Sequence, residues 1–232
     1  MKDANAKAVL VVDAAFSARI KNIAHKLPNL KLIIATNIGD FLPGWKKFLA
    51  IYLLRKLPHG KVAPLPGKTV IKFMDILKTY SSEFEVKKVS PDSTCLLMYT
   101  GGTTGFPKGS VLSHRNICSN IVQISTFFQV ERGKRVGISG FPYFHAAGTT
   151  ICNMSINLGI AQIQIPDPRN TKHICNEIEK FNPYILVNVP SLYQMLLKTP
   201  KFKTLEFSED LIALSAAAPF PSESIKELEE VI

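Results

Sequence analysis

The sequence predicts an α/β fold with largely parallel sheets and flanking helices. Short apolar runs alternate with segments of helical periodicity along most of the chain, a pattern typical of strands joined by crossover helices. Hydrophobic residues make up 46% of the 232 residues and charged residues 20%, so the chain can bury a substantial core. No apolar run approaches the ~20 residues that a membrane-spanning helix needs.

The alternation begins near the N-terminus, where the apolar runs 8–12 and 30–35 are expected to form a parallel pair of strands. The residues expected on the buried face of the intervening helix, 16–27, are Phe16, Ile20, Ile23, Ala24 and Leu27. Further strands are expected at 95–99, 135–139, 160–165, 184–187 and 211–214. Further helices are expected at 74–80, 113–128, 147–158, 171–181, 191–197 and 222–231.

Two of these helices carry start signals. Ser113 is the expected N-cap of the helix 113–128, because its hydroxyl can accept a hydrogen bond from a free backbone N–H of the first turn. In the last helix, Ser224 and Glu227 have the spacing of a capping box.

The net charge of +10 is concentrated in one segment, residues 41–74, which we expect to be a basic surface excursion of the domain. Its basic residues are Lys46, Lys47, Arg55, Lys56, Lys61, Lys68 and Lys72, and it contains no acidic residue. Such a patch favours an anionic partner, namely nucleic acid, an anionic membrane or a phosphorylated small molecule, although a solvated basic face explains it equally well. No nucleic-acid recognition motif accompanies it, so no nucleic-acid partner is expected.

The apolar run 48–54 within this segment spans only ~10 Å as a helix, against ~30 Å of hydrocarbon in a bilayer. Two interpretations remain open. The run lies at a membrane interface, with Trp45 and Tyr52 at headgroup depth, or it is a short buried helix with exposed basic ends. The first predicts a peripheral membrane contact.

The cysteines, Cys95, Cys118, Cys152 and Cys175, are widely spread and form no C-x-x-C pair. Reduced buried thiols are therefore expected, and no metal site. The N-terminal residues lack the layout of a signal peptide. These features indicate a cytoplasmic protein, with membrane association left open.

The segment from Tyr99 to Gly109 is the most specific in the sequence. Its glycines let the backbone turn tightly and bring N–H groups close to a ligand, while its threonines add hydroxyl donors and Lys108 a mobile positive charge. Many donors, one cation and no carboxylate suit a polyphosphate. The expected phosphate-binding residues are Thr100, Gly101, Gly102, Thr103, Thr104, Gly105 and Lys108. The spacing differs from that of a Walker A loop, because Phe106 rather than lysine follows Gly105.

This loop, continued by residues 113–116, resembles the signature of the adenylate-forming (AMP-binding) superfamily. Residues 141–148, with the sequence FPYFHAAG, are similar to the aromatic-histidine segment of that superfamily, and residues 215–219 to its small-residue turn against adenine. Residues 40–43 and the basic segment after them look most like the long-chain fatty acid–CoA ligase branch, an acyl-CoA synthetase.

The resemblance implies ATP-dependent activation of a fatty acid. A carboxylate would attack the α-phosphate of Mg-ATP to give an acyl-adenylate, and the thiol of coenzyme A would then displace AMP. The implied cofactors are ATP, Mg²⁺ and coenzyme A. In this interpretation His145 lies near the acyl carboxylate as the catalytic residue, and Ala217 and Ala218 form part of the adenine-binding wall.

The resemblance also implies that residues 1–232 are a partial AMP-binding domain, an internal fragment truncated at both ends. The alternative interpretation is a non-catalytic remnant that retains nucleotide or lipid binding. In either case the chain alone is not expected to complete acyl-CoA synthesis, and a separate chain supplying the carboxyl-terminal part is a candidate partner. Acyl chain length and oligomeric state stay open.

Overall fold

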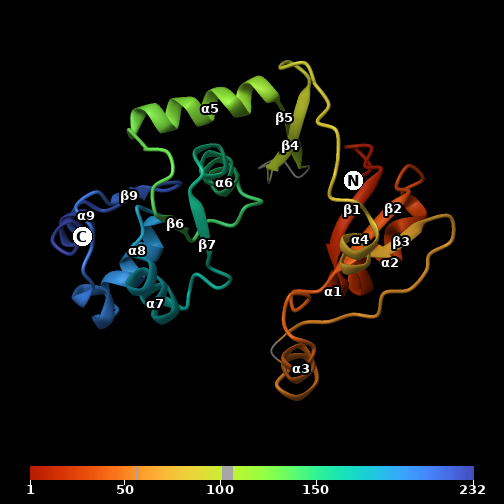
Figure 1. The fold of residues 1–232 in the computed structure, drawn as a ribbon, viewed down its shortest axis with the longest axis horizontal. Helices are drawn as coiled ribbons and strands as arrows, with labels where there is room; N and C mark the ends of the chain where they lie inside the picture. The colour runs from red at the N-terminus through yellow and green to blue at the C-terminus, as the bar shows by residue number, and fades with distance from the viewer. Residues whose placement is uncertain (56, 101–106) are drawn as a thin grey trace. The chain divides into compact units, whose positions relative to one another are not determined.

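The computed structural model describes residues 1–55, 57–100 and 107–232 and divides the chain into two compact units, Met1–Lys88 and Val89–Ile232 (Figure 1). Each unit contains a parallel sheet with its own helices, so the predicted α/β class is confirmed. None of the helices in the described residues is both long and apolar enough to span a bilayer.

The first unit is built on a parallel sheet in the order β1-β2-β3, formed by β1 (Ala8–Val12), β2 (Leu32–Thr36) and β3 (Thr69–Lys72). The predicted pairing of the first two strands is confirmed. β3 was not predicted, because its four residues lie inside the basic segment 41–74 and read as loop. The end of that segment is therefore a strand of the sheet and not a surface excursion.

Four short helical pieces replace the single helix expected over 16–27. They are α1 (Asp13–Ala15), a π-helical turn (Phe16–Ile20), α2 (Lys21–Ile23) and a 3-10 turn (Ala24–Lys26). Phe16, Ile20 and Ala24 are spaced four residues apart, wider than the 3.6 residues of an α-helical turn, and the widened π turn keeps them on one buried face. Ile23 is 37% exposed, so its predicted place in the core is wrong.

The remaining helices of this unit are α3 (Gly44–Phe48), a π-helical turn that continues it (Leu49–Leu53), and α4 (Phe73–Thr79). A cavity of about 470 Å³ lies where the three strands end, lined by Asp13, Asn37 and Lys72 among others. Asn37 is buried, and its Nδ2 donates to Asp13 Oδ2 at 2.9 Å. Polar groups at the carboxyl ends of β1 and β2 are thereby held together.

Asp40 fastens α3 to the end of β2. Its carboxylate accepts hydrogen bonds from Lys47 Nζ at 2.5 Å, from the Asn37 N–H at 2.7 Å and from Thr36 Oγ1 at 2.9 Å. Burial raises the pKa of Asp40, but the hydrogen bonds from Lys47, Asn37 and Thr36 outweigh that effect, so the pKa lies below its ordinary value.

Replacing Asp40 with asparagine is expected to lower the free energy of unfolding of the first unit by about 1–2 kcal/mol at neutral pH, because the charge-assisted bonds are lost. Since the folded-state pKa is depressed, the contribution of the carboxylate is fully present above about pH 4 and is lost as the pH falls through the folded-state pKa. Urea unfolding followed by the fluorescence of Trp45, the only tryptophan, measures this. Glu83→Gln, at an exposed position, is the control. A difference between Asp40→Asn and the parent that stays constant down to acidic pH would contradict the assignment.

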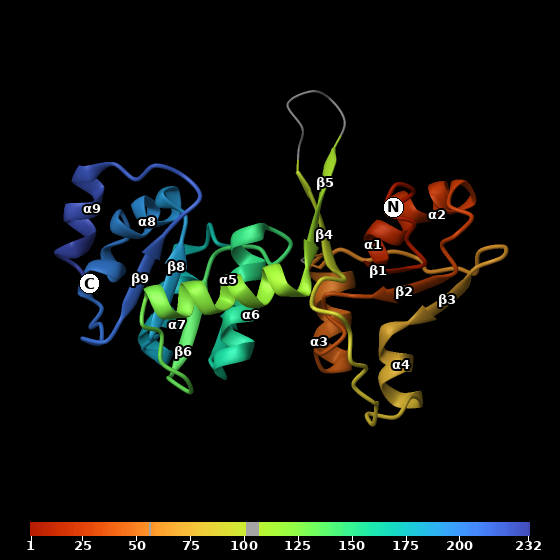
Figure 2. The same ribbon diagram turned by 90° about the horizontal axis from the view of Figure 1, so that it is seen from above.

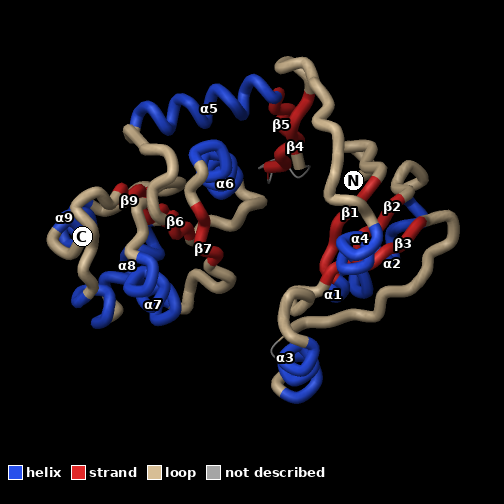
Figure 3. The backbone as a smooth tube through the Cα atoms, viewed as in Figure 1, coloured by secondary structure: helices blue, strands red, loops and turns tan. Residues whose placement is uncertain are grey.

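The second unit contains a four-stranded parallel sheet in the order β7-β6-β8-β9, preceded by an antiparallel hairpin, β4-β5 (Figures 2 and 3). The strands are β4 (Thr94–Thr100), β5 (Lys108–Ser113), β6 (Val136–Ser139), β7 (Ala161–Gln164), β8 (Ile185–Asn188) and β9 (Ile212–Ser215). The helices are α5 (His114–Phe127), α6 (Ala146–Leu158), α7 (Thr171–Phe181), α8 (Pro190–Leu197) and α9 (Ser222–Glu229). The strands and helices expected here are confirmed, and β5 is the unpredicted addition.

Helices cover both faces of this sheet. On one face Leu186 packs in a buried cluster with Tyr193 of α8 and Ile174 of α7. On the other face its neighbours in sequence, Ile185 and Val187, pack with residues of α6 such as Met154. This alternation is the period-two pattern of a strand buried on both faces, and it explains why Ile185 to Val187 of β8 are all apolar.

The two predicted helix starts have different outcomes. Ser113 is the N-cap of α5 and forms a capping box with Asn116: its Oγ accepts from the Asn116 N–H at 3.1 Å. The box expected at Ser224 is wrong, because α9 begins at Ser222 and Ser224 lies inside its first turn. There the hydroxyl of Ser224 accepts from Gln194 Nε2 at 3.2 Å and connects α9 to α8.

Candidate functional site

The strand order of the four-stranded sheet places a topological switch point between β6 and β8. From β6 the chain passes through α6 to β7 on one side, and from β8 it passes through α8 to β9 on the other. In open parallel sheets, ligands bind outside the carboxyl ends of the strands at such a point. The loops that follow β6, β8 and β9 therefore frame the candidate site.

Asn188, the last residue of β8, joins the two strands at the switch point. It is 1% exposed, and its Oδ1 accepts a hydrogen bond from the Gly140 N–H, just beyond β6, at 3.0 Å. The sequence analysis missed both residues. The available signal was a polar side chain, Asn188, directly after the apolar run 184–187. Its role in joining two strands could not be inferred without knowing which strands are neighbours.

His145 lies on the loop after β6 and is the N-cap of α6. Its side chain is exposed, its ring stacks on that of Phe141 with centroids 6.0 Å apart, and its Nδ1 accepts a hydrogen bond from the Ala147 N–H at 3.3 Å. Because Nδ1 acts as the acceptor, the proton of the neutral ring is on Nε2. The exposed N–H is thus available to a carboxylate or phosphate oxygen.

The turn that carries His145 is closely packed. The His145 N–H donates to the Pro142 carbonyl at 2.9 Å, and Thr149 Oγ1 donates to the Tyr143 carbonyl at 2.7 Å. A Cβ atom on Gly148 would lie only 2.2 Å from the Pro142 oxygen, so only glycine permits this approach of the turn to α6. The backbone thereby determines where the imidazole projects.

Ala217 and Ala218 lie in the turn after β9, at the same carboxyl edge of the sheet, and both are exposed. The Ala216 N–H donates to the Asn188 carbonyl at 3.2 Å, which connects this turn to β8. Ala217 has a φ of 71°, a left-handed conformation that is uncommon for a residue other than glycine. The structure thus places His145 and the two alanines at one edge, on the loops after β6 and β9.

The hairpin β4-β5 holds the described ends of the glycine-rich loop. Thr100 and Lys108 are directly opposite each other in the register, so their side chains share one face of the hairpin. Both side chains are exposed. The other predicted phosphate-binding residues, Gly101, Gly102, Thr103, Thr104 and Gly105, lie outside the described residues. Within the described part, no hydrogen bond or ion pair joins Lys108 to His145 or to Ala217.

A cavity of about 230 Å³ lies between the hairpin, α5 and the first turn of α6. Its apolar lining includes Leu96, Met98, Leu112 and Ile117. Ala146, the residue that follows His145, also lines it. The cavity, whose polar lining is Asn116, Asn120, Thr149 and Thr150, therefore begins one residue beyond His145 in the chain.

For a metal ion, the described residues contain no group of three or more His, Cys, Asp or Glu side chains that could hold one. Magnesium usually keeps several waters and binds through one or two carboxylates together with substrate phosphates.

Comparison with known proteins identifies the family of this chain. The family model described as "AMP-binding enzyme" matches residues 1–232. The long-chain-fatty-acid–CoA ligase of Bacillus subtilis (strain 168) is 30% identical over 237 residues, which cover 100% of this chain and 41% of that protein. The ligase of the same name from Escherichia coli O6:H1 is 28% identical and matches 97% of this chain and 40% of its own length. The chain thus spans about two fifths of the curated relatives it matches.

Solved structures show the same fold. The anthranilate CoA ligase AuaEII in complex with anthranoyl-AMP superimposes with a TM-score of 0.74 at 19% identity, covering 99% of this chain and 40% of that one. A long-chain-fatty-acid-CoA ligase from Archaeoglobus fulgidus gives a TM-score of 0.72 at 20% identity and the same coverage. At these identities the likeness establishes the architecture alone.

Proposed function

Because this chain belongs to the AMP-binding enzyme family, we propose that it is part of an ATP-dependent fatty acid–CoA ligase that activates its substrate as an acyl-adenylate. The observation that carries the proposal is the convergence of His145 and the turn at Ala217 and Ala218 on the carboxyl edge of one parallel sheet. In such sheets this edge is where ligands bind.

The glycine-rich loop would hold the β- and γ-phosphates of ATP. The proposed ligands are Thr100, Gly101, Gly102, Thr103, Thr104, Gly105 and Lys108. Phosphoryl chemistry needs positioning and neutralisation of charge more than covalent help from the protein. A loop with many hydrogen-bond donors and one lysine would supply both. The paired strands β4 and β5 hold the described ends of this loop.

His145 would act on the substrate carboxylate. A carboxylate oxygen attacks the α-phosphorus, an oxygen–phosphorus bond forms, and the bond to the bridging oxygen breaks to release pyrophosphate. Two anions approach each other in this step, so the Nε2–H of His145 and the positive end of α6 lower the barrier by facing the developing charge. Ala217 and Ala218, having small side chains, would leave a flat wall for adenine.

The apolar cavity beside Ala146 would receive the start of the acyl chain. A volume of about 230 Å³ is below the range of typical ligand pockets, so this cavity would hold only the first part of a long acyl chain. In the second step the sulfur of coenzyme A attacks the acyl carbon, the carbon–oxygen bond to AMP breaks, and the thiol proton is released. Mg²⁺ would enter with the phosphates of ATP.

Exchange of labelled pyrophosphate into ATP tests the proposal. The 232-residue chain is assayed with magnesium and a panel of fatty acids, first alone and then with the separately produced carboxyl-terminal portion of the Bacillus subtilis relative. Exchange that requires a fatty acid supports the ligase. ATP binding without exchange in both arms would favour the alternative, a nucleotide-binding protein without catalysis, and would refute the proposed activity.

A further inference from the structure

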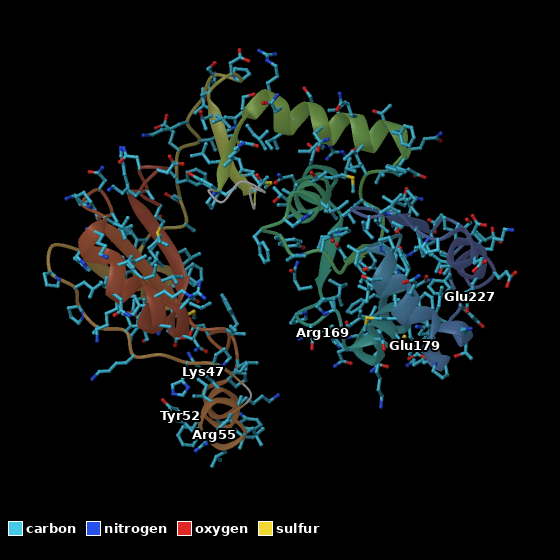
Figure 4. All side chains as sticks on the ribbon, turned by 180° about the vertical axis from the view of Figure 1, so that it is seen from behind. Lys47, Tyr52, Arg55, Arg169, Glu179 and Glu227 are labelled. Atoms are coloured by element: carbon cyan, nitrogen blue, oxygen red, sulfur yellow. The ribbon has the colours of Figure 1, made fainter. Side chains whose placement is uncertain are left out.

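The helix α3 and the π turn after it present an exposed surface of aromatic and basic side chains in the first unit. We call this the α3 surface and define it by Trp45, Lys46, Phe48, Tyr52, Leu53 and Arg55. Lys47, Tyr52 and Arg55 are labelled on this segment in Figure 4. A contiguous exposed cluster of large apolar side chains marks an interaction surface.

The inner side of the segment is fixed to the sheet. Lys47 forms an ion pair with Asp40 at 2.5 Å, Ile51 is 6% exposed, and the Leu57 N–H donates to the Ala50 carbonyl at 3.3 Å. Of the two interpretations of the run 48–54, the buried helix therefore holds only for Ile51. Because the inner side is anchored, the segment cannot rotate to hide its other side chains.

The outer side carries the aromatic rings. Trp45 is 67% exposed, and Phe48 and Tyr52 are each 58% exposed. Their spacing of three and four residues places them on one helical face. The rings of Phe48 and Tyr52 lie 5.2 Å apart, and His59 continues the row at 5.3 Å from Tyr52. Phe48, Tyr52 and His59 thus form a row of adjoining rings, and the exposed Trp45 lies three residues before Phe48. We call these rings the aromatic strip.

Positive charge borders this strip. Lys46 Nζ lies 5.3 Å from the ring of Trp45, and the exposed Arg55 follows at the other end of the helix. No acidic residue occurs from Phe41 to Met74. Aromatic rings favour the headgroup region of a bilayer, and lysine and arginine favour anionic lipid phosphates. The α3 surface carries both aromatic rings and basic side chains. It therefore matches the headgroup region of an anionic bilayer in apolarity and in charge.

We propose that the α3 surface docks this chain on anionic lipid bilayers, with Trp45, Phe48 and Tyr52 in the headgroup region and Lys46 and Arg55 on lipid phosphates. The contact is peripheral. It rests on the geometry of the first unit and is independent of the adenylation chemistry proposed for the second.

Trp45 reports on the contact directly, because it is the only tryptophan of the chain. The whole chain is titrated with vesicles of phosphatidylcholine alone and with vesicles that also contain phosphatidylglycerol. We expect a blue shift of the emission and protection from acrylamide only with the anionic vesicles. Both effects should decline with salt, since exposed charges are screened over ~10 Å at ~0.1 M. The absence of a shift, or an equal shift with both vesicles, would overturn the proposal.

Substitutions separate the surface from general basicity. Lys46→Gln with Arg55→Gln keeps the Lys47–Asp40 pair and should weaken vesicle binding about thirty-fold, since each cation near an anionic surface contributes about five-fold. Lys21→Gln with Lys26→Gln removes two exposed cations elsewhere in the same unit and is the matched control. Equal weakening by both pairs would overturn the assignment to this surface. Circular dichroism confirms that each variant is folded.

The aromatic contribution is tested by Phe48→Ser with Tyr52→Ser, which retains Trp45 as the probe. This variant should lose most of the blue shift even at low salt, because charge alone does not carry the indole into the headgroup region. A single-stranded oligonucleotide serves as the competing anion. A Trp45 shift produced by the oligonucleotide and not by the vesicles would identify a nucleic-acid surface and refute the lipid one.

Discussion

Replacing Lys108 with alanine is expected to weaken ATP binding about ten- to a hundred-fold, the range for loss of one charge-assisted contact. Lys108 is the only cation of the glycine-rich segment and shares a hairpin face with Thr100. Equilibrium dialysis of labelled ATP against the 232-residue chain measures the change. At ATP concentrations well below saturation, the same substitution should slow pyrophosphate exchange by a similar factor if the lysine neutralises phosphate equally in the bound and reacting states.

Lys198→Ala is the matched control for Lys108→Ala. Lys198 is exposed at the carboxyl end of α8, which runs from the carboxyl edge of the sheet to the opposite edge. Lys108→Arg keeps the charge but changes its shape, so it should recover part of the affinity. Unchanged ATP affinity in Lys108→Ala would refute the role of Lys108 in phosphate binding. An equal loss of ATP affinity in Lys198→Ala would show that the effect comes from net charge and not from this position.

Much of the fold could be predicted because several strands of the two parallel sheets, such as β1, β2 and β8, are mainly apolar and are separated by segments of helical periodicity. The run 184–187 shows why: β8 is buried on both faces, and its first three residues, Ile185 to Val187, are all apolar. β3 and β5 lack that signature. β3 has only two apolar residues between Thr69 and Lys72, while β5 begins with exposed residues such as Lys108 and Gly109. Their pairing with β2 and β4 is visible only in three dimensions.

The separate segments of the candidate site could be predicted from the sequence, but their arrangement in space could not. His145 and Ala217 were identified by their resemblance to family segments 72 residues apart in the chain. Their common position depends on the strand order β7-β6-β8-β9, which long-range pairing determines. Asn188 was missed for the same reason. Its carbonyl and side-chain oxygens accept hydrogen bonds from Ala216 and Gly140, so one buried residue positions the loops after β9 and β6 together.

Replacing Gly148 with alanine is expected to lower the free energy of unfolding of the second unit by about 1–3 kcal/mol, the range for overpacking a closely packed site. The added Cβ would lie 2.2 Å from the Pro142 oxygen and 3.1 Å from the Tyr143 Cα. Both neighbours are backbone, so the turn or the start of α6 must shift. Chemical denaturation measures the loss. Gly44→Ala is the control, because no atom lies within 4 Å of its added Cβ.

The shift caused by Gly148→Ala should also separate two functions of the site. The turn from Pro142 to His145 carries the imidazole, whereas no backbone hydrogen bond among the described residues joins Gly148 to the hairpin β4-β5. Fatty-acid-dependent exchange should therefore fall in this variant while ATP affinity stays at the parental value, measured at a temperature where the variant is folded. Loss of ATP affinity without loss of exchange would refute the positioning role. If Gly148→Ala unfolds at the same denaturant concentration as the parent, the turn accommodates the added Cβ without loss of stability. The predicted decrease in the free energy of unfolding would then be wrong.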